Sequence, residues 1–295
     1  MDKNLMGIFA PISTPFTSTG DVDYKGLEKN LAIYAASGLK GYLALGSNGE
    51  NKSLTNDEKL KVLEVILKNK GSDQYVMAGC IYESTFETIE MGKKMKKLNP
   101  DYFTLLPPSY FKSQMTDAVL YRYFSDVASA LDAPCLVYNA PQFSGGLALS
   151  VNLIKKCTGH PNIVGVKDSS SGNMESILFA VRDNFNVMSG TINNFLQCML
   201  MGGVGGVLSL ANSFPKVTVD LYNKLYEKKY AEAIALYERN LQVNKIVSGK
   251  GGVAAVKYAM DLAGLVGGEA RLPLLPLADE DKQNIKEKLQ AEGLI

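Results

Sequence analysis

Short apolar segments recur along the whole chain, and each has the length of a buried strand. They begin roughly 20 to 35 residues apart, which is the span of one strand-and-helix unit. The eight segments are 7–12, 42–45, 75–79, 102–106, 135–138, 163–167, 186–189 and 206–210. Amphipathic helical patterns fill the gaps, and two of them, at 55–58 and 84–87, begin like capping boxes. Eight such units in succession predict an α/β protein built as a (β/α)8 barrel, the TIM barrel.

Helical patterns continue beyond the eighth strand. One of them completes the eighth unit and three more follow it, at 217–228, 230–247, 253–263 and 279–291. No segment of low complexity separates the later helices from the barrel. We therefore expect a barrel over residues 1–228 that carries the active site, and a C-terminal helical extension over residues 229–295.

The composition argues against several classes of partner. The chain has 31 Lys and Arg residues against 30 Asp and Glu residues, and a net charge of +1 favours neither nucleic acid nor an anionic membrane. No apolar run reaches membrane-spanning length, and the first residues lack the pattern of a secretory signal peptide. We therefore expect a cytoplasmic protein that binds neither nucleic acid nor a membrane.

Metal sites and histidine-dependent catalysis are also disfavoured. The four cysteines, Cys80, Cys135, Cys157 and Cys198, are widely scattered and predict reduced residues of the core. The single histidine, His160, excludes any site with several histidine ligands. It falls in a predicted loop before a strand, and that end of a barrel strand is rarely catalytic. We expect neither a metal ion nor another cofactor.

Lys167 closes the apolar segment 163–167 and is the strongest candidate for a catalytic residue. Burying an ammonium group is costly, so burial lowers the pKa of a lysine. A neutral amine is a nucleophile, and its natural electrophile is a ketone. The alternative is a structural lysine whose amine reaches solvent or pairs with Asp168.

Further polar groups follow the predicted strands at their carboxyl ends, where the active sites of barrels lie. The turn at 46–50 reads Gly-Ser-Asn-Gly-Glu, and the fifth strand ends in Tyr138. The turn resembles a phosphate-binding loop, but Asn51 stands where that pattern requires glycine. Its N–H groups and the hydroxyl of Ser47 suit a smaller anion such as a carboxylate. Alternatively, Ser47 only holds its own turn through a hydroxyl–backbone bond.

Five motifs occur in order along the chain, at 46–50, 107–110, 137–141, 165–168 and 206–209. Together they resemble the pyruvate-dependent class I aldolases, the family that includes dihydrodipicolinate synthase and N-acetylneuraminate lyase. The resemblance runs essentially from end to end. It implies an enzyme that takes pyruvate and an aldehyde as small-molecule substrates and assembles as a homotetramer, a dimer of dimers.

The resemblance also implies roles for single residues. Lys167 would form the Schiff base with pyruvate, and Tyr138 would donate and accept protons beside it. Ser47 would contact the pyruvate carboxylate and help to relay protons. Tyr110 would reach across a tight dimer into the site of the neighbouring subunit, although Ser109 replaces the aromatic residue that usually precedes it.

The distal part of the site departs from dihydrodipicolinate synthases. By resemblance, the backbone of Gly190 and Leu208 would line the pyruvate pocket, while Asn48 and Ser169 would hold substrate oxygens. The synthases carry an arginine shortly after the tyrosine segment, where it binds the carboxylate of aspartate semialdehyde. The segment 141–145 contains none here, which removes bidentate recognition of that carboxylate.

This departure and the form of the glycine turn resemble 4-hydroxy-2-oxoglutarate aldolases most. We therefore expect a lyase that cleaves a 4-hydroxy-2-oxo acid, with 4-hydroxy-2-oxoglutarate as the best candidate, to pyruvate and an aldehyde, or that runs the reverse condensation. The alternatives are dihydrodipicolinate synthesis from pyruvate and aspartate semialdehyde, and cleavage of a sugar acid or N-acetylneuraminate. A ligand-binding barrel without catalysis is a further possibility, because fold does not determine function.

Overall fold

The structure is a computed structural model and describes residues 1–181 and 185–295. Eight parallel strands, paired in chain order, close into a barrel, as the apolar segments predict. The strands are β1 (Gly7–Pro11), β2 (Gly41–Ala44), β3 (Tyr75–Gly79), β4 (Tyr102–Leu105), β5 (Cys135–Asn139), β6 (Ile163–Asp168), β7 (Asn186–Ser189) and β8 (Gly205–Val207). Nearly every strand residue is buried, which explains why the segments are continuously apolar instead of alternating.

The helices lie where the amphipathic patterns predict them. They are α1 (Tyr24–Ala35), α2 (Asn56–Asn69), α3 (Thr85–Lys96), α4 (Asp117–Leu131), α5 (Val151–Cys157), α6 (Met174–Ala180), α7 (Phe195–Leu200), α8 (Pro215–Tyr226), α9 (Tyr230–Ser248), α10 (Gly252–Leu262) and α11 (Asp279–Ala291). Thr55 and Glu58 form the predicted capping box of α2. At α3 the Ser84 hydroxyl accepts from the N–H of Glu87, which is one half of such a box.

The eighth strand is shorter than the sequence predicts. It ends at Val207, and Ser209–Asn212 form a 3-10 helix, η5. A short apolar run does not distinguish a strand from a buried helical turn. The turn is fixed by Asn212, whose Nδ2 donates to the carbonyl oxygen of Pro11 and whose Oδ1 accepts from the N–H of Ser13.

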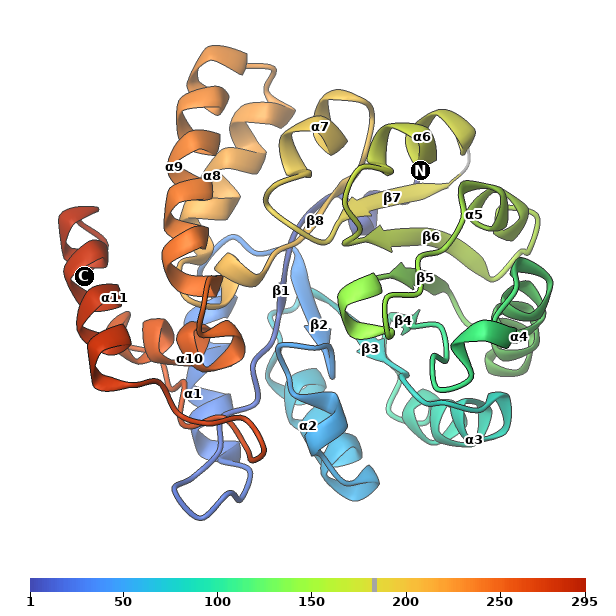
Figure 1. Cartoon of the computed structure of the whole chain (residues 1–295), viewed down its shortest axis with the longest axis horizontal. Helices are drawn as coiled ribbons and strands as arrows, with labels where there is room; N and C mark the ends of the chain where they lie inside the picture. Colours follow the sequence, from blue (N-terminus) through green and yellow to red (C-terminus); the bar gives the residue numbers. More distant parts are fainter. Residues whose placement is uncertain (182–184) are drawn as a thin grey trace. The chain divides into compact units, whose positions relative to one another are not determined.

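The chain divides into two compact units. The first comprises residues 1–7 and 75–207 and contains β3 to β8. Its helices α3 to α7 follow one another along the strands, each beside the next (Figure 1). The register aligns Tyr138 of β5 with Lys167 of β6, and Lys167 with Met188 of β7.

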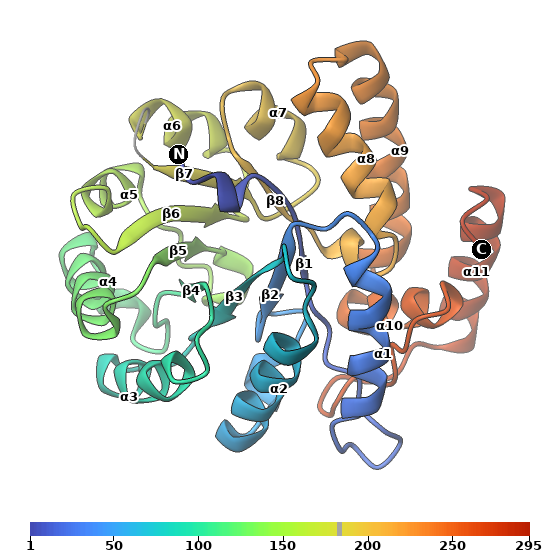
Figure 2. The ribbon, with the colours of Figure 1, turned by 180° about the vertical axis from the view of Figure 1, so that it is seen from behind.

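The second unit comprises residues 8–74 and 208–295. It contains β2, nearly all of β1, the helices α1 and α2, and the C-terminal helices. There α8 lies beside α9, and α9 also contacts α10 and α11 (Figures 1 and 2). The predicted boundary at residue 228 falls between α8 and α9, and the division that it marks stays a prediction. In the described residues, no helix is both long and apolar enough to cross a membrane.

Candidate active site

Lys167 occupies the penultimate position of β6, at the carboxyl end of the strand. Its register partners are Tyr138 and Met188. Gly165 permits the close approach of β7, because a methyl group at this position would lie 2.5 Å from the carbonyl oxygen of Asn186. Lys167 is 4% exposed, so the lysine is as buried as its apolar segment predicts.

Tyr138 lies directly against the amine of Lys167. The lysine Nζ is 3.5 Å from the centroid of the tyrosine ring, and Tyr138 itself clusters with Ile81 and Leu106. Burial lowers the pKa of Lys167, and Tyr138 and Asp168 oppose part of that fall. A buried amine in contact with a phenol can act as a neutral nucleophile that has a proton donor and acceptor beside it.

The residues that follow Tyr138 and Lys167 form a buried hydrogen-bond network. Nδ2 of Asn139 donates to Oδ1 of Asp168 at 2.7 Å, and the hydroxyl of Ser170 donates to the same oxygen at 2.8 Å. Oδ1 of Asn139 accepts from the N–H of Leu149. The Asn139 side chain therefore links β5 to β6 and to the end of the loop that follows β5. Sequence reasoning missed the pairing of Asn139 with Asp168, because it depends on the register between β5 and β6.

Asp168 influences Lys167 without being its direct partner. Successive strand residues face opposite sides, so Asp168 contacts Asn139 and Ser170 while Lys167 contacts Tyr138. Burial raises the pKa of Asp168, and the hydrogen bonds from Ser170 and Asn139 oppose that rise. Its second oxygen, Oδ2, is buried without a hydrogen-bond partner among the described residues.

Ser169 and Gly190 meet just beyond the ends of β6 and β7. The N–H of Ser169 donates to the carbonyl of Asn139 at 2.8 Å, and the N–H of Gly190 donates to that of Asp168 at 2.7 Å. A methyl group at Gly190 would lie 1.8 Å from the hydroxyl oxygen of Ser169, so a larger residue here would displace that hydroxyl. The structure thus brings two of the predicted substrate-binding residues together at the strand ends that carry Lys167.

Tyr110 does not belong to the buried cluster. Its side chain is 82% exposed, and its ring meets that of Phe111 edge-on, with centroids 5.0 Å apart. Glu83 fixes the backbone at this point, because its Oε2 accepts from the N–H groups of Ser109 and Tyr110. The role of Tyr110 in a neighbouring subunit stays a prediction.

The loop after β5 approaches the loop after β4. It begins with a 3-10 helix, Pro141–Phe143, and the buried hydroxyl of Ser144 bonds to the carbonyl of Ala140. A methyl group at Gly146 would lie 3.0 Å from Nζ of Lys112. Lys112 therefore places a positive charge beside residues 141–145, where the synthases carry an arginine and this chain has none. Sequence reasoning missed Lys112 because no local pattern links two loops that lie on different strands.

Ser47 and Asn48 lie in the second unit, in the turn after β2. Both residues are half-buried. The N–H of Glu50 closes the turn on the carbonyl of Ser47 at 3.1 Å, and Oδ1 of Asn48 accepts from the hydroxyl of Ser209 at 3.3 Å. Leu208, the residue before Ser209, is fully buried. Within this unit the structure therefore links the predicted binding residue Asn48 to the segment that contains Leu208.

The described residues contain no cluster of metal-ligand side chains, and His160 has hydrogen-bond partners on both ring nitrogens. Among the described residues, no three His, Cys, Asp or Glu side chains are grouped to hold a metal ion. Nδ1 of His160 accepts from the N–H of Asn162, and Nε2 lies 2.9 Å from the hydroxyl of Ser129. In the neutral ring the proton is then on Nε2, so His160 donates to Ser129 and cannot act as its base.

Comparison with known sequences places the chain in one family. Residues 4–292 match the dihydrodipicolinate synthetase family. A protein of Neisseria gonorrhoeae called 4-hydroxy-tetrahydrodipicolinate synthase is 31% identical over 98% of this chain and 99% of its own length. One of the same name from Bartonella bacilliformis is 30% identical over 99% of each chain. An uncharacterized DapA-like lyase of Thermococcus onnurineus is 30% identical over 97% of this chain and 99% of its own.

Solved structures agree in fold over nearly the whole chain. The dihydrodipicolinate synthase of Acinetobacter baumannii, complexed with pyruvate, superposes with a TM-score of 0.93 at 29% identity over 99% of this chain and 100% of its own. A prophage protein of E. coli K12 from the same family, also in complex with pyruvate, gives 0.92 at 27% identity over 98% and 99%. This chain therefore belongs to the dihydrodipicolinate synthetase family and is a pyruvate-dependent lyase of the class I type.

Proposed function

We propose that the protein activates pyruvate as a Schiff base on Lys167 and joins it to an aldehyde, or releases pyruvate from the corresponding adduct. The observation that carries this proposal is the buried amine of Lys167, 3.5 Å from the ring of Tyr138. Family membership and two relatives solved with pyruvate support it.

The chemistry follows from a neutral lysine. Nζ of Lys167 attacks the keto carbon of pyruvate, and loss of water leaves an iminium ion. The positive charge acidifies the methyl group, whose proton leaves to give an enamine. The enamine carbon bonds to the aldehyde carbon, and water then hydrolyses the imine and frees the amine. In this scheme Tyr138 accepts and donates the protons. Cleavage runs through the same steps in reverse.

The remaining residues hold the substrate in this proposal. The hydroxyl of Ser47 binds the carboxylate of pyruvate and helps to pass protons to Tyr138, while Asn48 and Ser169 hold oxygens of the second substrate. The backbone at Gly190 and Leu208 lines the pyruvate pocket. Tyr110 completes the site of a second subunit in a homotetramer. A monomeric dihydrodipicolinate synthase variant shares the fold (TM-score 0.93, 23% identity), so the assembly has to be measured.

Two aldehydes are candidates for the second substrate. The names of the relatives favour aspartate semialdehyde, and thus condensation to 4-hydroxy-tetrahydrodipicolinate. This support is stronger than any that the comparisons give to 4-hydroxy-2-oxoglutarate, the substrate that the sequence motifs favour.

One feature of this chain nevertheless argues against binding aspartate semialdehyde in the way that the synthases do, and so keeps cleavage of 4-hydroxy-2-oxoglutarate as the second candidate. The segment that includes Pro141–Phe143 offers no guanidinium fork for a carboxylate. Lys112 supplies only a point charge beside the loop. A site without a partner for a buried carboxylate binds a substrate that carries one less well by several kcal/mol, which lowers its kcat/KM by about 10²-fold or more.

Both reactions should be measured on one preparation. Condensation of pyruvate with aspartate semialdehyde is compared with release of pyruvate from 4-hydroxy-2-oxoglutarate, with a keto-deoxy sugar acid and N-acetylneuraminate as further substrates. A kcat/KM that is higher for the condensation establishes the synthase reaction, and the opposite order establishes the aldolase. If none of these substrates is turned over and pyruvate with borohydride does not label Lys167, the proposal is refuted and a ligand-binding barrel is left.

A further inference from the structure

Glu50, the last residue of the glycine turn after β2, adopts a left-handed backbone conformation, with φ 51° and ψ 42°. A glutamate seldom adopts this conformation and keeps it only where the surrounding contacts determine it. Its N–H donates to the carbonyl of Ser47, so the strained residue directly closes the turn that carries Ser47 and Asn48. The contacts of the Glu50 side chain therefore decide how firmly this turn is held.

The carboxylate of Glu50 is buried and held at both oxygens. Oε1 lies 2.5 Å from Nζ of Lys257, and the two side chains are 1% and 0% exposed. Oε2 accepts from the N–H of Arg271 at 2.8 Å. Lys257 also donates to the carbonyl of Glu269 at 2.8 Å. A single carboxylate thus links the turn to α10 and to the segment that follows it.

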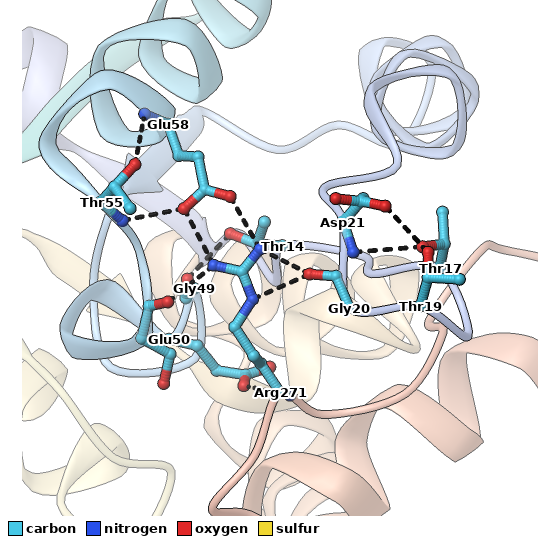
Figure 3. A network of polar contacts seen from close by, with 11 residues as sticks. Thr14, Thr17, Thr19, Gly20, Asp21, Gly49, Glu50, Thr55, Glu58 and Arg271 are labelled. Atoms are coloured by element: carbon cyan, nitrogen blue, oxygen red, sulfur yellow. Dashed lines mark hydrogen bonds and ion pairs between the residues drawn. The ribbon is translucent and has the colours of Figure 1, made fainter.

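The side chain of Arg271 fastens the same C-terminal segment a second time (Figure 3). Its Nη1 and Nη2 donate to the two carboxylate oxygens of Glu58, at 2.9 and 2.7 Å. The guanidinium also donates to the carbonyls of Gly20 and Ser53. The bond to Arg271 holds the pKa of Glu58 down at about 2. The segment is therefore fixed on both sides of the point where its backbone binds Glu50.

We infer that Glu50 is a positioning residue for substrate, held in place by Lys257 and by the backbone N–H of Arg271. The inference rests on the proposed function, in which Ser47 and Asn48 meet substrate oxygens. A turn held rigidly before the substrate arrives offers its hydroxyl and N–H groups without an ordering cost at the moment of binding. The C-terminal region thereby contributes to pyruvate affinity from outside the site.

A positioning role differs measurably from a structural one. A structural contact lowers the melting temperature when it is lost, but the protein that remains folded binds pyruvate as before. Loss of a positioning contact weakens pyruvate binding well below the melting temperature. It should leave the pH dependence of the amine at Lys167 unchanged, because Glu50 acts on the turn that carries Ser47 and Asn48 and not on that amine.

The test compares Glu50→Gln with Glu58→Gln, a matched change in the same network at a residue without a role in the turn. The pyruvate concentration for half-maximal borohydride labelling is measured together with KM, kcat and the pH profile. For Glu50→Gln we expect the pyruvate concentration for half-maximal labelling to rise about 10-fold or more, with the pH profile unchanged. For Glu58→Gln the pyruvate concentration for half-maximal labelling should stay within about two-fold of that of the unchanged protein, although the melting temperature falls.

A second variant covers failure to fold. Glu50→Gln leaves the buried Lys257 ammonium without its anion, whereas Glu50→Gln/Lys257→Met removes both charges, a change that proteins often tolerate. This double variant should fold and still show the raised half-saturation. A folded Glu50→Gln or double variant with half-saturation within about two-fold of the unchanged protein would overturn the inference alone. Absence of any label in the unchanged protein would overturn the proposed function and this inference with it.

Discussion

Lys167 and Lys257 are both buried, at 4% and 0% exposure, yet they have different partners. Nζ of Lys257 meets the carboxylate of Glu50 at 2.5 Å, whereas Nζ of Lys167 faces the ring of Tyr138. Burial lowers the pKa of both amines, and at Lys257 the contact with Glu50 works against it. The difference teaches that burial makes a lysine a nucleophile only where its partners do not hold the proton in place.

The nearest charge along the chain sharpens this contrast. Asp168 directly follows Lys167, but its Oδ1 is occupied by Asn139 and Ser170. It favours the ammonium form of Lys167 through space without forming an ion pair such as that between Glu50 and Lys257. The pKa of each amine is lowered, so the difference lies in the partners: Nζ of Lys257 is held by a carboxylate, whereas Nζ of Lys167 faces the ring of Tyr138.

The largest effect is expected at Tyr138. Replacing it by phenylalanine keeps the ring over Lys167 but removes the group that moves protons, and loss of one general acid–base group costs about 10²–10⁴-fold. Tyr138→Phe should therefore lower kcat by that factor with little change in pyruvate binding, measured by steady-state kinetics and by the pyruvate dependence of borohydride labelling. A variant within a few-fold of the unchanged enzyme would show that protons take another route.

Exchanging each lysine for methionine separates the two roles. Lys257→Met leaves the Glu50 carboxylate buried without its cation, so the free energy of unfolding should fall by about 3–5 kcal/mol. Lys167→Met removes a costly buried amine, and stability should stay the same or rise. Urea unfolding measures both. Equal losses in the two variants would contradict the contrast between them.

Much of the fold could be predicted from local patterns. The strands β3 and β7 match their apolar segments, and α11 matches its helical pattern, because buried strands and amphipathic helices leave periodic signals in the sequence. The burial of Lys167 followed from its position at the end of such a segment. The predicted end of β8 was wrong. The turn after the strand is fixed by hydrogen bonds of the Asn212 side chain, and the hydrophobic pattern carries no information about such contacts.

The contacts that distinguish the two lysines could not be predicted in this way. Glu50 and Lys257 are far apart in the sequence, and neither lies in a pattern that points to the other. The pairing of Asn139 with Asp168 depends on strand register, which single residues do not reveal. Family resemblance gave Tyr138 and Lys167 their roles, but it did not indicate what holds Ser47 and Asn48 in place.

A smaller effect is expected at Asp168. The amine of Lys167 must be neutral to attack, so kcat/KM rises with pH as the amine loses its proton. Asp168→Asn removes a charge that favours the ammonium form, which lowers the pKa of Lys167 further and moves this acidic limb to lower pH. Asp126→Asn, the same change at an exposed residue of α4, should leave the pH profile in place. A limb that moves to higher pH would give Asp168 another role.

The smallest effect concerns Glu58. Its pKa is held at about 2 by Arg271, so the stability it contributes is present above the ordinary carboxyl pKa near 4.5 and is lost as pH falls toward 2. Because the pair is partly exposed, we expect Glu58→Gln to cost only about 1 kcal/mol at neutral pH. Melting temperatures of both proteins should converge in acid. A difference that persists unchanged at pH 2 would exclude the ion pair as its source.

The most direct test of the contrast is covalent labelling of the intact protein. After incubation with pyruvate and borohydride, peptide mass spectrometry should find one reduced pyruvate per chain, on Lys167 and not on Lys257. The label should vanish in Lys167→Met and persist in folded Lys257→Met. Label on Lys257, or label that survives Lys167→Met, would contradict the assignment of Lys167 as the nucleophile.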